Sequence, residues 1–113
     1  MPAGNRDDGV VVEIAWHVNP LRGDRFREGW LPIAEAVVDY GATWWAFLRG
    51  HEGGLDFIQL AAFPSKADFE RYWYSERAAE ARIELSGYYQ VPLLPKYHEV
   101  VGSGDLEARS PAA

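Results

Sequence analysis

The sequence predicts an α+β domain in which four antiparallel strands form one sheet and two helices cover one of its faces. Three observations support this prediction. Strand-like and helix-like stretches follow one another in the order β-α-β-β-α-β, a Gly-rich turn joins the two middle strands, and two stretches repeat apolar residues at helical spacing. The chain of 113 residues is long enough for one hydrophobic core and too short for two.

The first strand is predicted at residues 10–18, because the run VVVEIAWHV is rich in β-branched side chains and ends at Asn19-Pro20. Side chains alternate between the two faces of a strand. One face therefore carries Val10, Val12, Ile14, Trp16 and Val18. The other face carries Val11 and Ala15, so the strand is apolar on both sides.

A helix is predicted to follow, with Asp24 as its N-cap and Gly41 as its natural stop. Its apolar residues recur at helical spacing along one stripe: Phe26, Trp30, Ile33, Ala34 and Val37. Pro32 lies inside this pattern and cannot donate a backbone hydrogen bond. We therefore expect a kink or a restart of the helix near Gly29.

The two middle strands are predicted at residues 43–49 (TWWAFLR) and 55–63 (LDFIQLAAF), and the turn HEGG joins them into a hairpin. Strand parity assigns one set of side chains to one face of each strand. These sets are Thr43, Trp45, Phe47 and Arg49 in the earlier strand, and Phe57, Gln59, Ala61 and Phe63 in the later one.

The second helical stretch is predicted to begin at Ser65, which with Asp68 forms a variant of the capping box. It extends to Gly87. Ser75 is a second capping residue inside this stretch, so a break into two helical segments is expected there.

A proline-punctuated connection, YYQVPLLP, leads to the fourth predicted strand at residues 97–102. The domain therefore spans residues 10–102. We expect residues 1–9 to be a disordered lead and residues 103–113 to be a flexible tail.

Two strand–helix–strand halves of this kind build a ferredoxin-like sheet, which is antiparallel and has both helices on one face. The other face of that sheet would expose apolar side chains from the first two strands. A second copy of the chain is the simplest cover for such a face, so we predict a homodimer.

Charge and composition disfavour several classes of function. The chain has 11 basic and 17 acidic residues, a net charge of −6 that disfavours binding to nucleic acid or to anionic membranes. It has no cysteine and three scattered histidines, so we expect neither disulfides, thiolate catalysis nor a metal site. We see no signal peptide and no run long enough to span a membrane, and we expect a cytoplasmic protein.

The end of the third strand, AAF, is followed by Pro-Ser and by a helix reading ADFERYWYSE. This arrangement resembles the dimeric α+β barrel superfamily, and within it the antibiotic-biosynthesis-monooxygenase-like proteins. The likeness spans about residues 10–102. It implies a dimeric barrel and a small-molecule cavity between the helices and the sheet of each subunit. The superfamily includes oxygenases, cyclases and haem-degrading enzymes, so the fold alone does not name the reaction.

Haem-degrading relatives use an Asn on strand one, a Trp at the end of strand three and a later His as the iron ligand. The matching places in this sequence hold His17 or Asn19, then Phe63, then Tyr72 or Trp73. Because two of the three elements are missing, the resemblance does not imply haem, and we expect no cofactor.

The resemblance implies most directly a cofactor-independent monooxygenase that acts on a planar phenolic or polyketide-like molecule. Such chemistry needs a flat apolar slot, a group that accepts the phenol proton, and donors for the oxyanion that develops. Catalytic roles are therefore predicted for His17, Asn19 and Tyr72. Substrate-binding roles are predicted for Trp45, Arg49, Phe57, Gln59, Phe63 and Trp73.

Each of these residues also has a structural interpretation. His17 could cap a loop carbonyl, and Asn19 could form a turn with its own backbone beside the following proline. Gln59 could bond across the sheet, and Arg49 could pair with a nearby surface carboxylate. The ring of Tyr72 could simply pack in the core, because it recurs with its neighbours at helical spacing.

Two other functions remain open. A polyketide cyclase on the same scaffold would have to recruit His17 or His98, and a non-catalytic dimeric domain would only bind a hydrophobic metabolite. Convergence of His17 and Gln59 on one void with Tyr72 and Trp73 would favour an enzyme. A densely packed interior would favour the binding domain.

Overall fold

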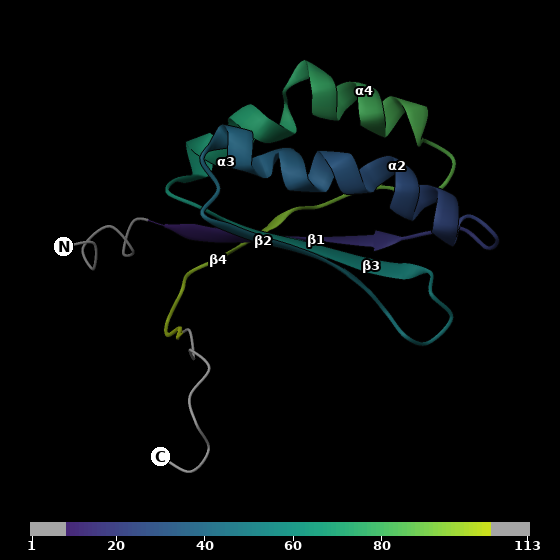
Figure 1. Ribbon diagram of the computed structural model, residues 1–113, viewed down its shortest axis with the longest axis horizontal. Coiled ribbons are helices and arrows are strands. Elements are labelled where there is room, and N and C mark those ends of the chain that lie inside the picture. Colours follow the sequence, from purple (N-terminus) through teal and green to yellow (C-terminus); the bar gives the residue numbers. More distant parts are fainter. Residues whose placement is uncertain (1–8, 105–113) are drawn as a thin grey trace, which may run out of the picture.

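The structure is a computed structural model that describes residues 9–104, and all of its helices lie on one side of a single sheet (Figure 1). In chain order the elements are β1 (Val10–His17), α2 (Gly23–Glu35), the 3₁₀ helix η1 (Ala36–Tyr40), β2 (Trp44–Arg49), β3 (Asp56–Phe63), α3 (Lys66–Trp73), α4 (Glu76–Glu84) and β4 (Lys96–His98). The expected lead up to residue 8 and the expected tail from residue 105 lie outside the described residues. Within residues 9–104, no helix is long and apolar enough to cross a membrane.

The four strands form an antiparallel sheet in the order β2-β3-β1-β4, with β2 and β3 joined as the expected hairpin. The α+β class and the antiparallel sheet are confirmed, and the arrangement is consistent with a ferredoxin-like fold. The fourth strand is shorter than expected, because it covers residues 96–98 instead of 97–102. His98 pairs with Val11, next to the first residue of β1, so β4 ends beside the start of β1.

The core lies between the helices and one face of the sheet. The predicted face of β1 is buried at Val12, Ile14 and Trp16, and the predicted face of β3 is buried at Phe57 and Phe63. Phe26, Trp30 and Val37 from the first helical stretch and Phe69, Tyr72 and Trp73 from α3 cover these two strands. The grouping of side chains by strand alternation is therefore confirmed for both central strands, and the structure shows which face of β1 the helices cover.

Helix α2 continues through Gly29 and Pro32 to Glu35, so it does not restart near Gly29 as one of the two expectations had it. The change of helix type comes later, at Ala36, where η1 begins. Pro32 and Glu28, whose carbonyl the proline leaves without an N–H partner, are both exposed, so water can satisfy that carbonyl. Gly41 ends η1 in the left-handed conformation, with φ of 95°, as its position predicts.

The two serine caps of the second helical stretch are confirmed. The Ser65 hydroxyl accepts a hydrogen bond from the backbone N–H of Asp68 at 3.2 Å and donates to the Asp68 carboxylate at 2.8 Å. Ser75 caps α4 by accepting from the backbone N–H of Ala78 at 3.2 Å. The chain therefore turns between α3 and α4 at the serine that the sequence indicated.

The face of the sheet away from the helices is open. Trp44, Leu48 and Ile58 lie on this face with 50%, 48% and 37% of their surface exposed. Trp44 is level with Ala62 and Val11 across three strands, and Leu48 is level with Ile58. The open face is thus a continuous apolar surface over β2, β3 and the start of β1.

Candidate functional site

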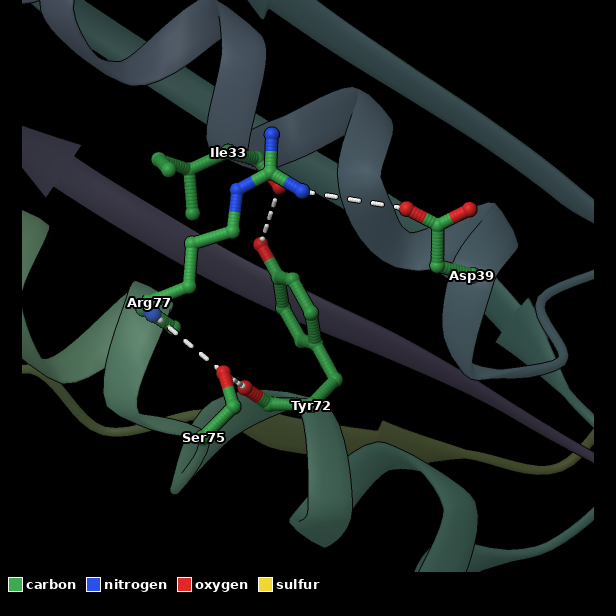
Figure 2. Close-up of polar contacts among 6 residues, drawn as sticks. Ile33, Asp39, Tyr72, Ser75 and Arg77 are labelled. Atoms are coloured by element: carbon green, nitrogen blue, oxygen red, sulfur yellow. Dashed lines mark hydrogen bonds and ion pairs between the residues drawn. The ribbon is translucent and has the colours of Figure 1, made fainter.

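A chain of three hydrogen bonds runs through the interior on the helix side of the sheet. Trp30 Nε1 donates to Gln59 Oε1 at 2.8 Å, Gln59 Nε2 donates to the Tyr72 hydroxyl at 3.0 Å, and that hydroxyl donates to the Ile33 carbonyl at 2.8 Å. Figure 2 shows the Tyr72 hydroxyl directed at Ile33. Burial raises the pKa of the Tyr72 phenol well above its usual value, because the ionised form would lose its hydration. Tyr72 is therefore a fixed neutral donor, and Gln59 has partners on both sides.

His17 lies on the opposite side of the sheet from Gln59 and Tyr72. Its neighbour Trp16 points into the core, and strand alternation turns His17 to the open face, where its side chain is 65% exposed. There its Nδ1 lies 2.9 Å from Asp56 Oδ1. His17 therefore does not converge with Gln59 and Tyr72 on one void, which is the arrangement that would have favoured an enzyme.

Asn19 ties the loop after β1 to the end of α4. Its side-chain amide donates to the Gly87 carbonyl at 2.7 Å, and its backbone N–H donates to the Tyr88 carbonyl at 2.8 Å. The three predicted catalytic residues thus occupy three separate places: the open face, a loop and the core.

Arg49 fastens the β2–β3 hairpin to the start of α2. Its Nε donates to the Gly54 carbonyl at 2.8 Å, and its Nη1 donates to Asp24 Oδ1 at 2.8 Å. Asp24 therefore does not cap α2 as expected, and the hydrogen bond from Arg49 lowers the pKa of its carboxyl group. The guanidinium lies so close to Gly23 that an added Cβ there would be 2.4 Å from Arg49 Nη2. Arg49 therefore uses its Nε and Nη1 donors for contacts within the protein.

Three of the predicted substrate-binding rings pack in or against the core. Phe57 and Phe63 are buried at 2% exposure each, and Trp45 is partly buried against the core. Phe57 stacks on Phe47 with ring centroids 5.4 Å apart, and Phe63 meets Phe69 edge-on at 5.7 Å. These rings fill space between the sheet and the helices.

Trp73 is different, because it also lines an open groove between α4 and the segment that follows it. This groove, which we call the Trp73 groove, has a volume of about 490 Å³. Its lining residues are Trp73, Ala79, Arg82, Ile83, Ser86, Tyr89, Val91 and Leu93. Most of them are apolar or aromatic, which suits an aromatic ligand.

Arg82 is the cation of the Trp73 groove. Its guanidinium carbon lies 4.1 Å from the centroid of the Trp73 ring, and its Nη1 donates to the Trp73 carbonyl at 2.8 Å. The Tyr89 hydroxyl donates to the Arg82 carbonyl at 3.2 Å. Partial burial lowers the pKa of Arg82 and raises the pKa of Tyr89. At neutral pH the groove therefore presents a guanidinium cation beside a neutral phenol.

Trp16 lies behind the wall of the Trp73 groove. Its ring centroid is 5.0 Å from that of Tyr89 and 6.3 Å from that of Trp73. Trp16 is fully buried, and among residues 9–104 its Nε1 is the one buried side-chain nitrogen or oxygen without a hydrogen-bond partner. A free donor at such depth is unusual in folded proteins.

A second groove, of about 610 Å³, lies between α2 and α4. It is lined by Gly29, Ile33, Tyr40, Glu76, Arg77, Glu80, Ala81 and Glu84. Arg77 at its edge reaches Asp39 at 3.7 Å, as Figure 2 shows. Three glutamates make this groove unsuited to a phenolate. No group of His, Asp or Glu within the described residues could hold a metal ion.

The same fold occurs in several solved structures. An antibiotic biosynthesis monooxygenase-like protein from Nitrosomonas europaea superposes with a TM-score of 0.76 at 12% identity, covering 84% of this chain and 92% of that one. SnoaB, a cofactor-independent oxygenase from Streptomyces nogalater, gives 0.73 at 12% identity over 85% and 96%. A monooxygenase-like protein from Caulobacter crescentus gives 0.73 at 14% identity over 85% and 92%.

This chain has the fold of the antibiotic biosynthesis monooxygenase-like proteins. The resemblance seen in the sequence is thereby confirmed for the fold. No protein-family profile and no curated protein sequence matches the chain.

Proposed function

We propose that the chain is a cofactor-independent monooxygenase that binds a planar phenolic or polyketide-like substrate in the Trp73 groove. The observation that carries this proposal is the Arg82 guanidinium, which lies over the Trp73 ring at the edge of an otherwise apolar groove. A flat apolar ligand gains from contact with the aromatic lining, and its oxygen gains from the neighbouring cation.

Arg82 would favour the ionised form of a bound phenol. A negative charge about 4 Å from a guanidinium is stabilised by roughly 1–4 kcal/mol between fully hydrated and partly buried conditions. This energy corresponds to a fall of about one to three units in the pKa of the phenol. Because the groove is open, the proton can leave to solvent, and the site does not require His17 as a base.

The substrate anion is also the reductant in the proposed reaction. In an anthrone-like substrate, deprotonation of the central CH₂ gives this anion, and its carbon reacts with O₂. One oxygen atom forms the new C=O bond, and the two hydrogens leave with the other oxygen as water. The protein's part is to bind the ring and to stabilise the anion through Arg82. SnoaB, which shares the fold, is a cofactor-independent oxygenase.

We further propose that the chain works as a homodimer joined through the open face of the sheet. Three large apolar side chains there, Trp44, Leu48 and Ile58, are between 37% and 50% exposed, and a second sheet would cover them. Ile58→Asp should convert the dimer to a monomer in light scattering after size-exclusion chromatography. Val38→Asp, which changes an exposed apolar residue on the helix side, should leave the dimer intact. A monomeric wild type would contradict the proposal.

A non-catalytic binding domain is the second candidate. It is favoured because the most polar side chains of the core already have hydrogen-bond partners within the protein. Gln59 and Tyr72, the most polar groups of the core, are already bonded to protein partners. A domain of this kind would bind the same aromatic ligands in the Trp73 groove without consuming oxygen.

Oxygen uptake with a tricyclic anthrone tests the proposed reaction. We expect Arg82→Gln to lower kcat/KM roughly ten- to hundredfold and to move the rise of kcat/KM with pH to higher pH, because the anion loses its cation. Arg77→Gln, on the same helix but outside the Trp73 groove, is the matched control and should behave like wild type. An unchanged pH profile in Arg82→Gln would refute the role of Arg82. Saturable anthrone binding without oxygen uptake would favour the binding domain.

A further inference from the structure

The unpaired Trp16 Nε1 marks a place where the free protein lacks a hydrogen-bond acceptor. Trp16 is fully buried, whereas the equally buried Trp30 donates its indole N–H to Gln59. An indole N–H that leaves water without gaining an acceptor loses the free energy of a hydrogen bond. A ligand oxygen that reached Trp16 would restore it.

The ring of Tyr89 lies between the ring of Trp16 and the Trp73 groove. Tyr89 lines the groove and at the same time meets Trp16 edge-on, with ring centroids 5.0 Å apart and planes at 88°. It also contacts Phe26 at 6.0 Å. Removal of this one ring would therefore join the open groove to the space beside Trp16.

The backbone at Tyr89 is fixed, while its hydroxyl is weakly held. Tyr89 forms a bridge with Val18, and the next residue, Gln90, donates its backbone N–H to the His17 carbonyl at 2.8 Å. The Tyr89 hydroxyl makes a 3.2 Å hydrogen bond to the Arg82 carbonyl, which is longer than the usual O–H···O distance of about 2.5–3.0 Å. The ring is 7% exposed and packs on Trp16 and Phe26, so a ligand ring that enters the slot must replace these contacts. Rotation of the side chain would open the slot without moving the strand beside it.

We infer that Tyr89 closes a ligand slot in the free protein, and that Trp16 Nε1 is the donor that holds a ligand oxygen once the Tyr89 ring has turned away. This inference rests on the proposed function, because it adds a second polar contact for the same ligand. The slot takes a planar ring in the space that the Tyr89 ring vacates, with an oxygen at the buried end beside Trp16. Arg82 lies at the open end and takes a second, anionic oxygen.

The competing interpretation is that the indole N–H of Trp16 faces an aromatic ring, a weak contact that needs no ligand. The two interpretations differ in what the loss of the N–H does to binding. A donor that meets a ligand oxygen contributes to the affinity for oxygen-bearing rings alone. A donor that faces an aromatic ring of the protein does not contribute to the affinity for any ligand.

Fluorescence titration of the full chain with 2-naphthol and with naphthalene tests the inference. We expect Trp16→Phe to weaken 2-naphthol binding about tenfold and to leave naphthalene binding unchanged. Tyr89→Ala should tighten both by up to about tenfold, because the closed state no longer competes. Tyr74→Ala, which removes an exposed tyrosine, is the matched control and should change neither affinity.

A second readout is recorded on wild-type protein, so it does not depend on the ligand affinity of any variant. The indole ¹⁵N–H resonance of Trp16, identified by its absence in Trp16→Phe, should move downfield with 2-naphthol and not with naphthalene. Unchanged 2-naphthol affinity in Trp16→Phe, an immobile resonance, or no tightening in Tyr89→Ala would overturn the inference. Absence of binding to wild type would overturn the proposed function with it. Binding that depends on Trp16 without oxygen uptake on an anthrone would keep the slot and refute only the oxygenase.

Discussion

Replacement of Gln59 by leucine tests whether this residue serves the core or a ligand. Gln59 accepts from Trp30 Nε1 at 2.8 Å and donates to the Tyr72 hydroxyl at 3.0 Å, and it is 2% exposed. Leucine keeps much of the volume but offers no acceptor. The Trp30 N–H would then be buried without a partner, whereas Tyr72 would still donate to the Ile33 carbonyl.

The size of the effect follows from these contacts. A buried donor left without an acceptor costs about 1–3 kcal/mol, so Gln59→Leu should lower the free energy of unfolding by that amount. Tyr72→Phe should cost a similar amount, about 1–3 kcal/mol, because it leaves the buried Gln59 Nε2 without its acceptor. The Ile33 carbonyl keeps the backbone N–H of Ala36 as a donor, so its loss of the Tyr72 hydroxyl adds little. We therefore expect the two substitutions to be about equally damaging.

Urea unfolding monitored by circular dichroism measures both variants, with midpoints compared at equal m-values. Titration with 2-naphthol on the folded variants then separates stability from binding, and we expect Gln59→Leu to bind as wild type does. A Gln59→Leu variant that is as stable as wild type but binds naphthol more weakly would refute the structural role. Gln59 would then be a ligand contact, as its position on the strand first suggested.

Three further substitutions test the local chemistry of the fold. Gly23→Ala should lower the free energy of unfolding by about 1–3 kcal/mol in urea titrations, because the added Cβ would lie 2.8 Å from the backbone carbonyl oxygen of Gly54 and would also displace the Arg49 guanidinium. An unchanged midpoint would show that the hairpin shifts to make room for the methyl group. Leu21→Asn should raise the free energy of unfolding by about 1 kcal/mol, since Leu21 has φ of 70° and is 97% exposed. A lower free energy of unfolding would mean that the leucine side chain has a partner in solution. Asp24→Asn should be less stable than wild type at neutral pH and equal to it in acid. Arg49 lowers the pKa of Asp24, so the stabilisation by the ionised carboxylate disappears as the pH falls below the ordinary value of 3.8. A difference in stability that persisted in acid would contradict the ion pair.

The sequence predicted the fold where neighbouring residues determine the structure. Ser65 and Ser75 cap helices because each hydroxyl reaches an N–H three residues later, and that distance is visible in the sequence. The end of β4 was not predictable in this way. Its length depends on where β1 begins, which is a property of the register between residues 11 and 98.

The candidate site was less predictable, because strand alternation does not say which face the helices cover. Trp16 and Phe57 lie opposite each other in the register, and both point into the core. Once that face is known, His17 must point away from it. Both faces of β1 are apolar, however, so the sequence left this choice open. Arg82 and Tyr89 were missed because they reach the groove only through the turn at Ser75 and the connection after α4.

The turn at Ser75 explains how one short helix serves both the core and the groove. Phe69 and Tyr72 lie on the face of α3 that meets the sheet, and Trp73 lies one position further around, where it meets both the core and the groove. In an uninterrupted helix, a residue nine positions after Trp73 would lie about 13 Å further along the axis. The Ser75 cap instead starts a new helix that returns Arg82 to 4.1 Å from the Trp73 ring. The break between α3 and α4 thus brings the cation to the aromatic wall, and without it the groove would lack its guanidinium group.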